Sequence, residues 1–171
     1  MSSDIIILNN ELLNELIFTN SLNLSIKFQK KCTNFFFIPN IGLKLYNPYI
    51  TWIDPFKKYI SFSFKKSDNI FLSHLLKNIN TKLQELYIKN SRNPQSLASF
   101  YFENKEYIYI RTYLPKTSNK YNINCIYNSE KVDFVIPRLK TSFKYIILHL
   151  RNIWEDNSKS AYHIELKMVE N

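Results

Sequence analysis

Apolar and polar residues alternate along many short segments of this chain, and a two-residue period is typical of β-strands that bury one face. Residues 59–64 show it clearly, with apolar side chains at Ile60, Phe62 and Phe64 and serines between them. Other segments are short apolar runs, and those before Pro39 and Pro48 are expected to end there. The predicted strands span residues 22–28, 35–38, 43–46, 49–53, 59–64, 107–114, 121–127, 132–136, 143–154 and 161–169.

One segment has the period of a helix instead. Leucine and isoleucine recur at intervals of three and four residues from Leu72 to Leu86, and lysine, asparagine and glutamate occupy the opposite face. Ser67 or Asp68 can cap the first turn, so a helix is predicted over about residues 68–90.

Strands, then one helix, then more strands is an order typical of a mainly β domain. We predict an OB-fold-like antiparallel barrel with one inserted helix, although a β-sandwich with a capping helix would give a similar pattern. Residues 1–20 are predicted to form an N-terminal arm or short helix, and residues 21–171 a single OB-like domain.

The composition excludes several classes of protein. Gly42 is the single glycine, so the glycine-rich loops that cradle nucleotide phosphates are absent. The N-terminus is acidic and no apolar stretch is long enough for a membrane span, so we expect a cytoplasmic protein without membrane association. Cys32 and Cys125 are expected to be free thiols in a reducing compartment.

Catalytic and metal-binding signatures are missing from the sequence. His74, His149 and His163 lie far apart, and none has a cysteine, aspartate or histidine at metal-ligand spacing. No acidic cluster suggests a two-metal nuclease site. We therefore predict that the protein is not an enzyme and holds no metal or cofactor.

Net charge is +9, and it is distributed unevenly. Residues 27–151 carry 21 basic and seven acidic side chains, a surplus of +14, whereas both ends of the chain are acidic. Such a field favours nucleic acid as a partner. Codon bias is the alternative explanation, because lysine outnumbers arginine 19 to 4, as A- and T-rich codons alone would produce.

The strand predicted at residues 107–114 suggests how a nucleic acid would be bound. One of its faces is core-like, and the other presents three tyrosine rings and Arg111, which suits base stacking and a phosphate contact. Aromatic pairing across a sheet, or burial of both faces, would explain the rings equally well. The core-like face consists of Ile108, Ile110, Thr112 and Leu114, and the other of Tyr107, Tyr109, Arg111 and Tyr113.

Lysines lie close to the aromatic residues of the predicted sheet. Two lysine pairs bracket strand 59–64, whose outward face has the small side chains Ser61 and Ser63 and so leaves room for a ligand backbone. Solvated strand ends would also carry such lysines. The predicted contacts with single-stranded DNA are Lys30, Lys31, Trp52, Lys57, Lys58, Tyr59, Lys65, Lys66, Tyr107, Tyr109, Arg111, Tyr113, Lys116 and Lys120.

A resemblance to a known family lies in the C-terminal third. Residues 134–138 precede an apolar strand predicted at 145–154 that ends in Trp154, and a short polar loop and an amphipathic strand at 162–168 follow it. This arrangement resembles the closing strands of replication-type single-stranded DNA-binding proteins. Similar proteins occur in yeast cytoplasmic linear (killer-type) plasmids, in poxviruses and in other large DNA viruses. The resemblance implies single-stranded DNA binding in replication.

These observations together predict a sequence-nonspecific single-stranded DNA-binding protein that uses aromatic stacking and lysine or arginine contacts to phosphates. The alternative is a non-enzymatic structural or protein-interaction β-domain, viral or plasmid-encoded, whose charge reflects codon bias. RNA binding, replication proteins as partners and homo-oligomer formation stay open.

Overall fold

A computed structural model describes residues 5–18, 24–30, 33–136 and 142–171. The predicted mainly β class is confirmed: strands precede and follow one long helix, and most of them belong to a single sheet in the order β1-β3-β12-β13-β7-β5-β4. The strands are β1 (Ile6–Ile7), β2 (Ser25–Lys30), β3 (Thr33–Tyr46), β4 (Pro48–Ile53), β5 (Tyr59–Lys65), β6 (Tyr101–Glu103), β7 (Tyr107–Tyr113), β8 (Lys116–Thr117), β9 (Lys120–Tyr121), β10 (Asn124–Tyr127), β11 (Glu130–Val132), β12 (Tyr145–Glu155) and β13 (Ser160–Glu170).

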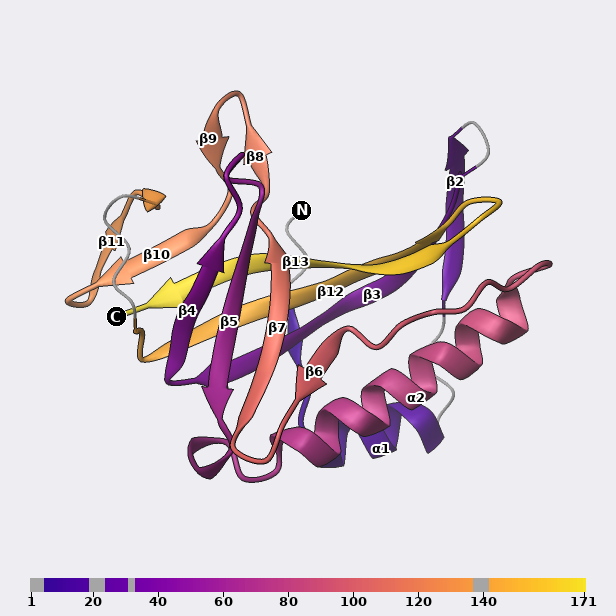
Figure 1. The fold of residues 1–171 in the computed structure, drawn as a ribbon, viewed down its shortest axis with the longest axis horizontal. Helices are drawn as coiled ribbons and strands as arrows, with labels where there is room; N and C mark the ends of the chain where they lie inside the picture. The colour runs from indigo at the N-terminus through magenta and orange to yellow at the C-terminus, as the bar shows by residue number, and fades with distance from the viewer. Residues whose placement is uncertain (1–4, 19–23, 31–32, 137–141) are drawn as a thin grey trace.

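The sheet is strongly bent. Strands β4, β5 and β7 run across the direction of the long strands β3, β12 and β13 (Figure 1). The pairing of β12 with β13 shifts register twice, at Lys167 of β13 and at Arg151 of β12, and these shifts mark bulges, which bend a strand. In the described part of the chain, β1 and β4 end the strand order, and the pairing of β4 beyond β5 is limited to one isolated bridge between Tyr49 and Ser142. The sheet therefore stays open and does not close into the predicted barrel.

The prediction was an antiparallel barrel, but some strand pairs are parallel. Strand β13 runs parallel to β7, where Glu165 is the register partner of Tyr113. Strand β1 runs parallel to β3, and β10 runs parallel to β13. Hairpin connections between neighbours in sequence yield antiparallel pairs, and these parallel pairs join strands that lie far apart in the chain.

The inserted helix is present as α2 (Leu72–Asn90), and it begins later than predicted. Lys66–Asp68 forms a 3-10 turn, and the residue before α2, Phe71, offers no side-chain cap. The intervening Asn69 is engaged elsewhere: its side chain accepts a hydrogen bond from the Tyr46 backbone N–H at 3.1 Å and donates to the Tyr46 carbonyl at 3.0 Å. This pair of bonds fixes the turn against β3 and delays the helix.

A shorter helix, α1 (Asn10–Phe18), lies beside α2 on the same side of the sheet (Figure 1). The α1 residue Leu13 is fully buried, and Leu8 just before the helix is 4% exposed. Part of the N-terminal segment therefore packs into the core. The division of the chain into an arm (1–20) and one domain (21–171) stays a prediction.

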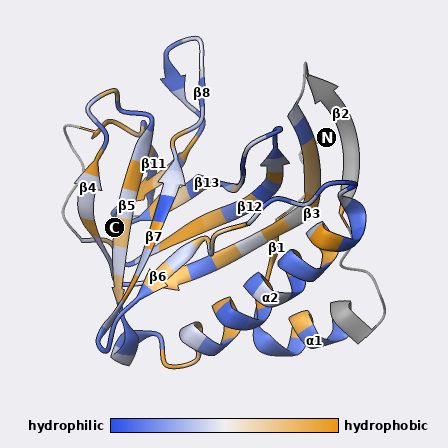
Figure 2. Cartoon of the chain, turned by 45° about the vertical axis from the view of Figure 1, so that its right-hand side comes forward, coloured by the Kyte–Doolittle hydropathy of each residue, from blue (hydrophilic) through white to orange (hydrophobic). Residues whose placement is uncertain are grey.

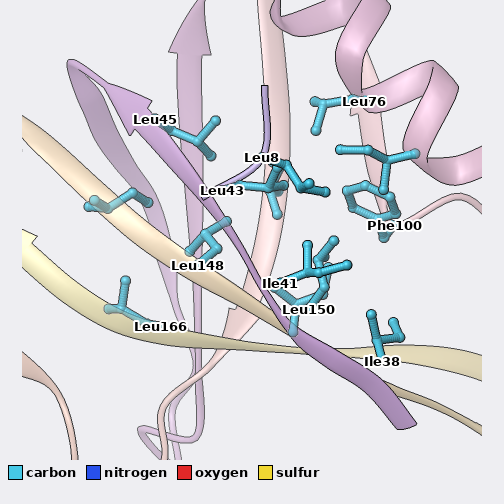
Figure 3. Close-up of a cluster of buried hydrophobic side chains, with 14 of the residues drawn as sticks. Leu8, Ile38, Ile41, Leu43, Leu45, Leu76, Phe100, Leu148, Leu150 and Leu166 are labelled. Atoms are coloured by element: carbon cyan, nitrogen blue, oxygen red, sulfur yellow. The ribbon is translucent and has the colours of Figure 1, made fainter. Parts of the chain in front are cut away.

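The core lies between the concave face of the sheet and α2. Hydrophobic and hydrophilic positions are interleaved along the strands and around the helix (Figure 2). Leu43 on β3, Leu148 and Leu150 on β12 and Leu76 on α2 meet in one buried cluster near Phe100 (Figure 3). Along β7 every second side chain is buried, which leaves the other face of this strand free for contacts outside the core.

Several strand boundaries differ from the prediction. Strand β3 continues through Pro39, because the register of its pairing with β12 shifts there: residues 38–40 of β3 lie opposite Arg151 alone. Pro39 therefore lies in an irregular stretch where its missing backbone N–H interrupts no regular ladder hydrogen bond. Pro48 begins β4 instead of ending β3. Residues 133–136 are not a strand.

None of the helices in the described ranges is long and apolar enough to cross a membrane. Cys125 is a free, half-buried thiol whose pKa is raised by burial. Cys32 lies outside the described residues.

Candidate nucleic-acid interface

Strand β7 presents two chemically different faces, as its alternation predicts. Ile108, Ile110 and Thr112 are at most 1% exposed and belong to the core side. On the opposite side Arg111 is exposed, and the flanking tyrosines are half-buried. The segment is therefore not buried on both faces.

The neighbouring strands extend this outer surface. On β5, Tyr59 is the register partner of Tyr113, and Ser61 is the partner of Arg111. On β4, Trp52 is in turn the partner of Ser61. We call this surface the tyrosine face, and it consists of Trp52, Tyr59, Ser61, Ser63, Lys65, Tyr107, Tyr109, Arg111 and Tyr113.

Arg111 lies at the centre of the tyrosine face, between two exposed rings. Its guanidinium carbon is 4.8 Å from the centre of the Trp52 ring and 4.5 Å from the centre of the Tyr59 ring. Trp52 is 42% exposed and Tyr59 is 37% exposed. Cation–π attraction holds the two rings in place while the guanidinium N–H groups can still reach a phosphate.

Other rings of the face contact one another across strands. Tyr59 and Tyr113 meet edge to face at 5.5 Å between ring centres, and the Tyr113 ring lies 5.0 Å from that of His163 on β13. Phe102 on β6 lies 5.9 Å from Tyr109. Aromatic pairing across the sheet is therefore real, and it coexists with partial exposure of the same rings. Pairing orients the rings and leaves surface for stacking.

Ser63 on β5 does not provide the predicted room for a ligand backbone, whereas Ser61 is half-buried. Ser63 is only 6% exposed, because it lies between Tyr49 and Tyr109 in the register of the three strands. The face is thus an aromatic platform without an open channel along β5.

Four predicted lysines gather near the Tyr113 end of the face. Lys57 and Lys58 are exposed in the β4–β5 turn, whose shape is fixed by Asp54: its carbonyl accepts from the Lys57 N–H at 2.8 Å and its carboxylate from the Lys58 N–H at 3.1 Å. Lys57 lines a cleft of about 400 Å³ together with Lys116 and Lys120. These lysines place positive charge beside the aromatic platform.

Two of these cations already have partners inside the protein. The Lys116 ammonium lies 4.3 Å from the centre of the Tyr121 ring, and Lys120 forms an exposed ion pair with Asp133 at 2.9 Å. Exposed pairs of this kind are weak, so both lysines can exchange partners with a phosphate.

The opposite end of the face carries fewer free cations than predicted. Lys65 is exposed, but Lys66 forms an ion pair with Glu103 at 2.8 Å, and the hydrogen bond from Lys66 lowers the pKa of that carboxyl. Lys30 ends β2, which pairs with β3 far from β7 in the sheet order, and Lys31 lies outside the described residues.

Sequence reasoning missed a contribution from the β12–β13 hairpin. Trp154, Tyr162 and His163 join Tyr59 and Tyr113 in lining a cleft of about 400 Å³. Trp154 and Tyr162 are half-buried, like His163. No local pattern could have located them, because only the parallel contact between β13 and β7 brings this hairpin to the tyrosine face.

Within the described ranges, no group of three or more histidine, cysteine, aspartate or glutamate residues could hold a metal ion. The tyrosine face itself presents aromatic rings, positive charges and hydroxyl groups.

Comparison with solved structures gives a similarity of fold, whereas comparison with sequences gives none. No protein-family model matches the chain, and no curated protein matches it. The resemblance to plasmid and viral proteins stays a prediction. Among solved structures, the fold is similar to that of the single-stranded DNA-binding protein from bacteriophage Enc34 in a C-terminally truncated form, with 14% sequence identity over 86% of this chain and 92% of that chain and a TM-score of 0.49.

Proposed function

We propose that this protein binds single-stranded DNA without sequence preference, with the tyrosine face as the base-stacking platform. The placement of Arg111 between the exposed rings of Trp52 and Tyr59 carries this proposal. A guanidinium among open rings offers a phosphate contact within reach of stacking surfaces. Stacking on such rings is worth about 1 to 3 kcal/mol per base and is tolerant of sequence.

The size of the face fits several nucleotides. Strand β7 has seven residues, so its outer side chains extend over roughly 20 Å. Lys57 and Lys58 lie beyond one end and Lys65 lies at the other. A single strand laid along β7 would thus meet rings in the middle and cations at both ends.

The test compares oligothymidine with duplex DNA of the same length. Oligothymidine should bind more tightly, because paired bases hide the faces that would stack on the tyrosines. Its log K should fall linearly with log salt, by about 0.7 for each phosphate contact. Stacked bases should also quench Trp52 fluorescence. Equal affinity for both DNA forms would remove the stacking argument, and a flat salt response would remove the charge argument.

In the cell, we propose a role without catalysis, in which the protein coats single strands during cytoplasmic DNA replication. Oligouridine in the same assay tests whether RNA is bound as well. Failure to bind any single strand at low salt would favour the alternative, a protein-interaction β-domain whose lysines reflect codon bias.

A further inference from the structure

A buried carboxylate lies beside the tyrosine face. The Glu165 side chain on β13 is 2% exposed, although it is the register partner of half-buried Tyr113 and faces away from the core. Its neighbours Ile164 and Leu166 are buried in the core, so the alternation of the strand places Glu165 on the outer side. A carboxylate this buried needs charged or hydrogen-bonding partners.

Three side chains provide these partners. Arg151 Nη1 donates a hydrogen bond to Glu165 Oε1, Lys167 Nζ lies 2.7 Å from Oε2, and His163 Nε2 lies 3.4 Å from Oε1. Burial alone would raise the pKa of the Glu165 carboxyl, but the adjacent His163 and Lys167 side chains, with the charges of Lys167 and Arg151, hold it well below its usual range. The carboxylate is therefore ionised at neutral pH.

The charges of this cluster do not balance. Arg151 and Lys167 share one carboxylate, so these three side chains carry a formal surplus of one positive charge. His149, the cross-strand partner of Glu165, adds no charge, because burial and the nearby Lys167 lower its pKa to about 4. One cation would have sufficed to compensate Glu165, and the second is available to another anion.

The cations are also accessible. The Arg151 side chain is 46% exposed and that of Lys167 is 29% exposed, whereas the carboxylate beneath them is covered. Glu165 holds both groups in a fixed position, so a ligand would lose little side-chain entropy on binding them. A guanidinium held in this way suits the paired oxygens of a phosphodiester.

We propose that Arg151 and Lys167, positioned by Glu165, form a binding site for a backbone phosphate of single-stranded DNA. This inference rests on the proposed function and extends it, since the strand would leave the tyrosine face at Tyr113, pass His163 and continue onto β13. Glu165 is a positioning residue, because it acts through the two cations.

The first experiment compares Arg151→Ala with Lys89→Ala, which removes one exposed cation from the end of α2, away from the tyrosine face. Arg151→Ala leaves Glu165 paired with Lys167, so the protein should fold. It should weaken oligothymidine binding roughly tenfold at low salt, as removal of one charged hydrogen bond implies. The salt slope should also decrease by about 0.7. Lys89→Ala should change affinity less than about twofold and leave the slope unchanged.

The second experiment uses Glu165→Gln and separates positioning from net charge. The substitution raises the protein's charge by one, so general electrostatic attraction predicts tighter binding. The proposal predicts weaker binding and a smaller salt slope, measured per folded protein with the melting curve recorded alongside, because the two cations lose their common anchor. Tighter binding would overturn the positioning role of Glu165.

The outcomes also separate this site from the proposed function. If wild-type protein fails to bind oligothymidine, both proposals are wrong. If wild-type protein binds and Arg151→Ala behaves like Lys89→Ala in affinity and slope, the phosphate site is wrong and the tyrosine face keeps its role.

Discussion

Truncation of adjacent residues on β7 should separate stability from binding. Ile110 is 1% exposed in the core, and Tyr109, the next residue towards the N-terminus, is half-buried on the tyrosine face. Ile110→Ala leaves a cavity near its register partner Phe62 and should cost about 2 to 5 kcal/mol of unfolding free energy. For a chain of this length that cost lowers Tm by roughly 5 to 20 °C. DNA binding by the folded fraction should be unchanged.

Tyr109→Ala should give the reverse result. Removal of one stacking ring costs about 1 to 3 kcal/mol of binding, or about 5- to 150-fold in the oligothymidine Kd. Its effect on stability comes from ring contacts such as that with Phe102, each worth about 0.5 to 1.5 kcal/mol, and from a long, exposed hydrogen bond of 3.4 Å from Asn104 to the Tyr109 hydroxyl. Tyr109→Phe keeps the ring and is the matched control, so it should bind almost like the wild type.

Thermal denaturation followed by circular dichroism measures the first effect, and fluorescence anisotropy of labelled oligothymidine at fixed salt measures the second. A large decrease in the Tm of Tyr109→Ala, with unchanged Kd, would show that this face is packing and that the DNA contacts lie elsewhere. In that case only the charge argument would survive.

Three further predictions concern charge, pH and a buried hydrogen bond between α2 and β12. The double variant Lys57→Ala with Lys58→Ala should lower the salt slope, measured by anisotropy, by roughly 0.7 for each phosphate that is no longer bound. The double variant Lys65→Ala with Lys66→Ala should lower the slope less, because Lys66 is already paired with Glu103. Equal slopes for the two double variants would contradict this reasoning. Burial lowers the pKa of His149 to about 4, so between pH 6.5 and 4 the unfolded chain binds more protons than the folded protein, and the unfolding free energy should fall as pH drops through this range. His149→Leu should reduce that fall in urea titrations. An unchanged pH dependence in this variant would show that other groups cause it. Tyr87→Phe removes the 2.5 Å hydrogen bond from the Tyr87 hydroxyl to buried Glu155 and should lower the unfolding free energy by about 1.5 to 3 kcal/mol. The variant should therefore have a lower Tm and an unchanged affinity for DNA. A wild-type Tm would refute this prediction.

Local patterns predicted the elements well because each depends on neighbouring residues. The two faces of β7 follow from strict alternation, and the apolar stripe of α2 follows from three- and four-residue spacing. The helix start was wrong because the Asn69 side chain bonds the backbone of Tyr46, 23 residues earlier in the chain. No helix-capping rule contains such a contact.

The residues of the tyrosine face could be predicted from their own segments, but their arrangement could not. Trp52, Tyr59 and Arg111 were each predicted as contacts, whereas the contact of both rings with Arg111 depends on the pairing of β4, β5 and β7. The ion pair between Lys66 and Glu103 could not be predicted either, because Lys66 precedes α2 in the chain and Glu103 follows it. Lysine counts give the total charge and do not show which cations are already paired.

The position of the Arg151 and Lys167 cluster follows from the core rather than from the surface. Ile164 and Leu166 are buried, and this fixes the register of β13, since a slip of one residue would turn both towards solvent and drive Glu165 into the apolar interior. Glu165 must therefore lie on the outer side, next to Tyr113 through the parallel contact with β7. Once it is there and covered, it requires cations. Arg151 on the adjoining strand β12 and Lys167 on β13 itself supply them. Packing on one face of the sheet thus determines where positive charge continues the tyrosine face on the other.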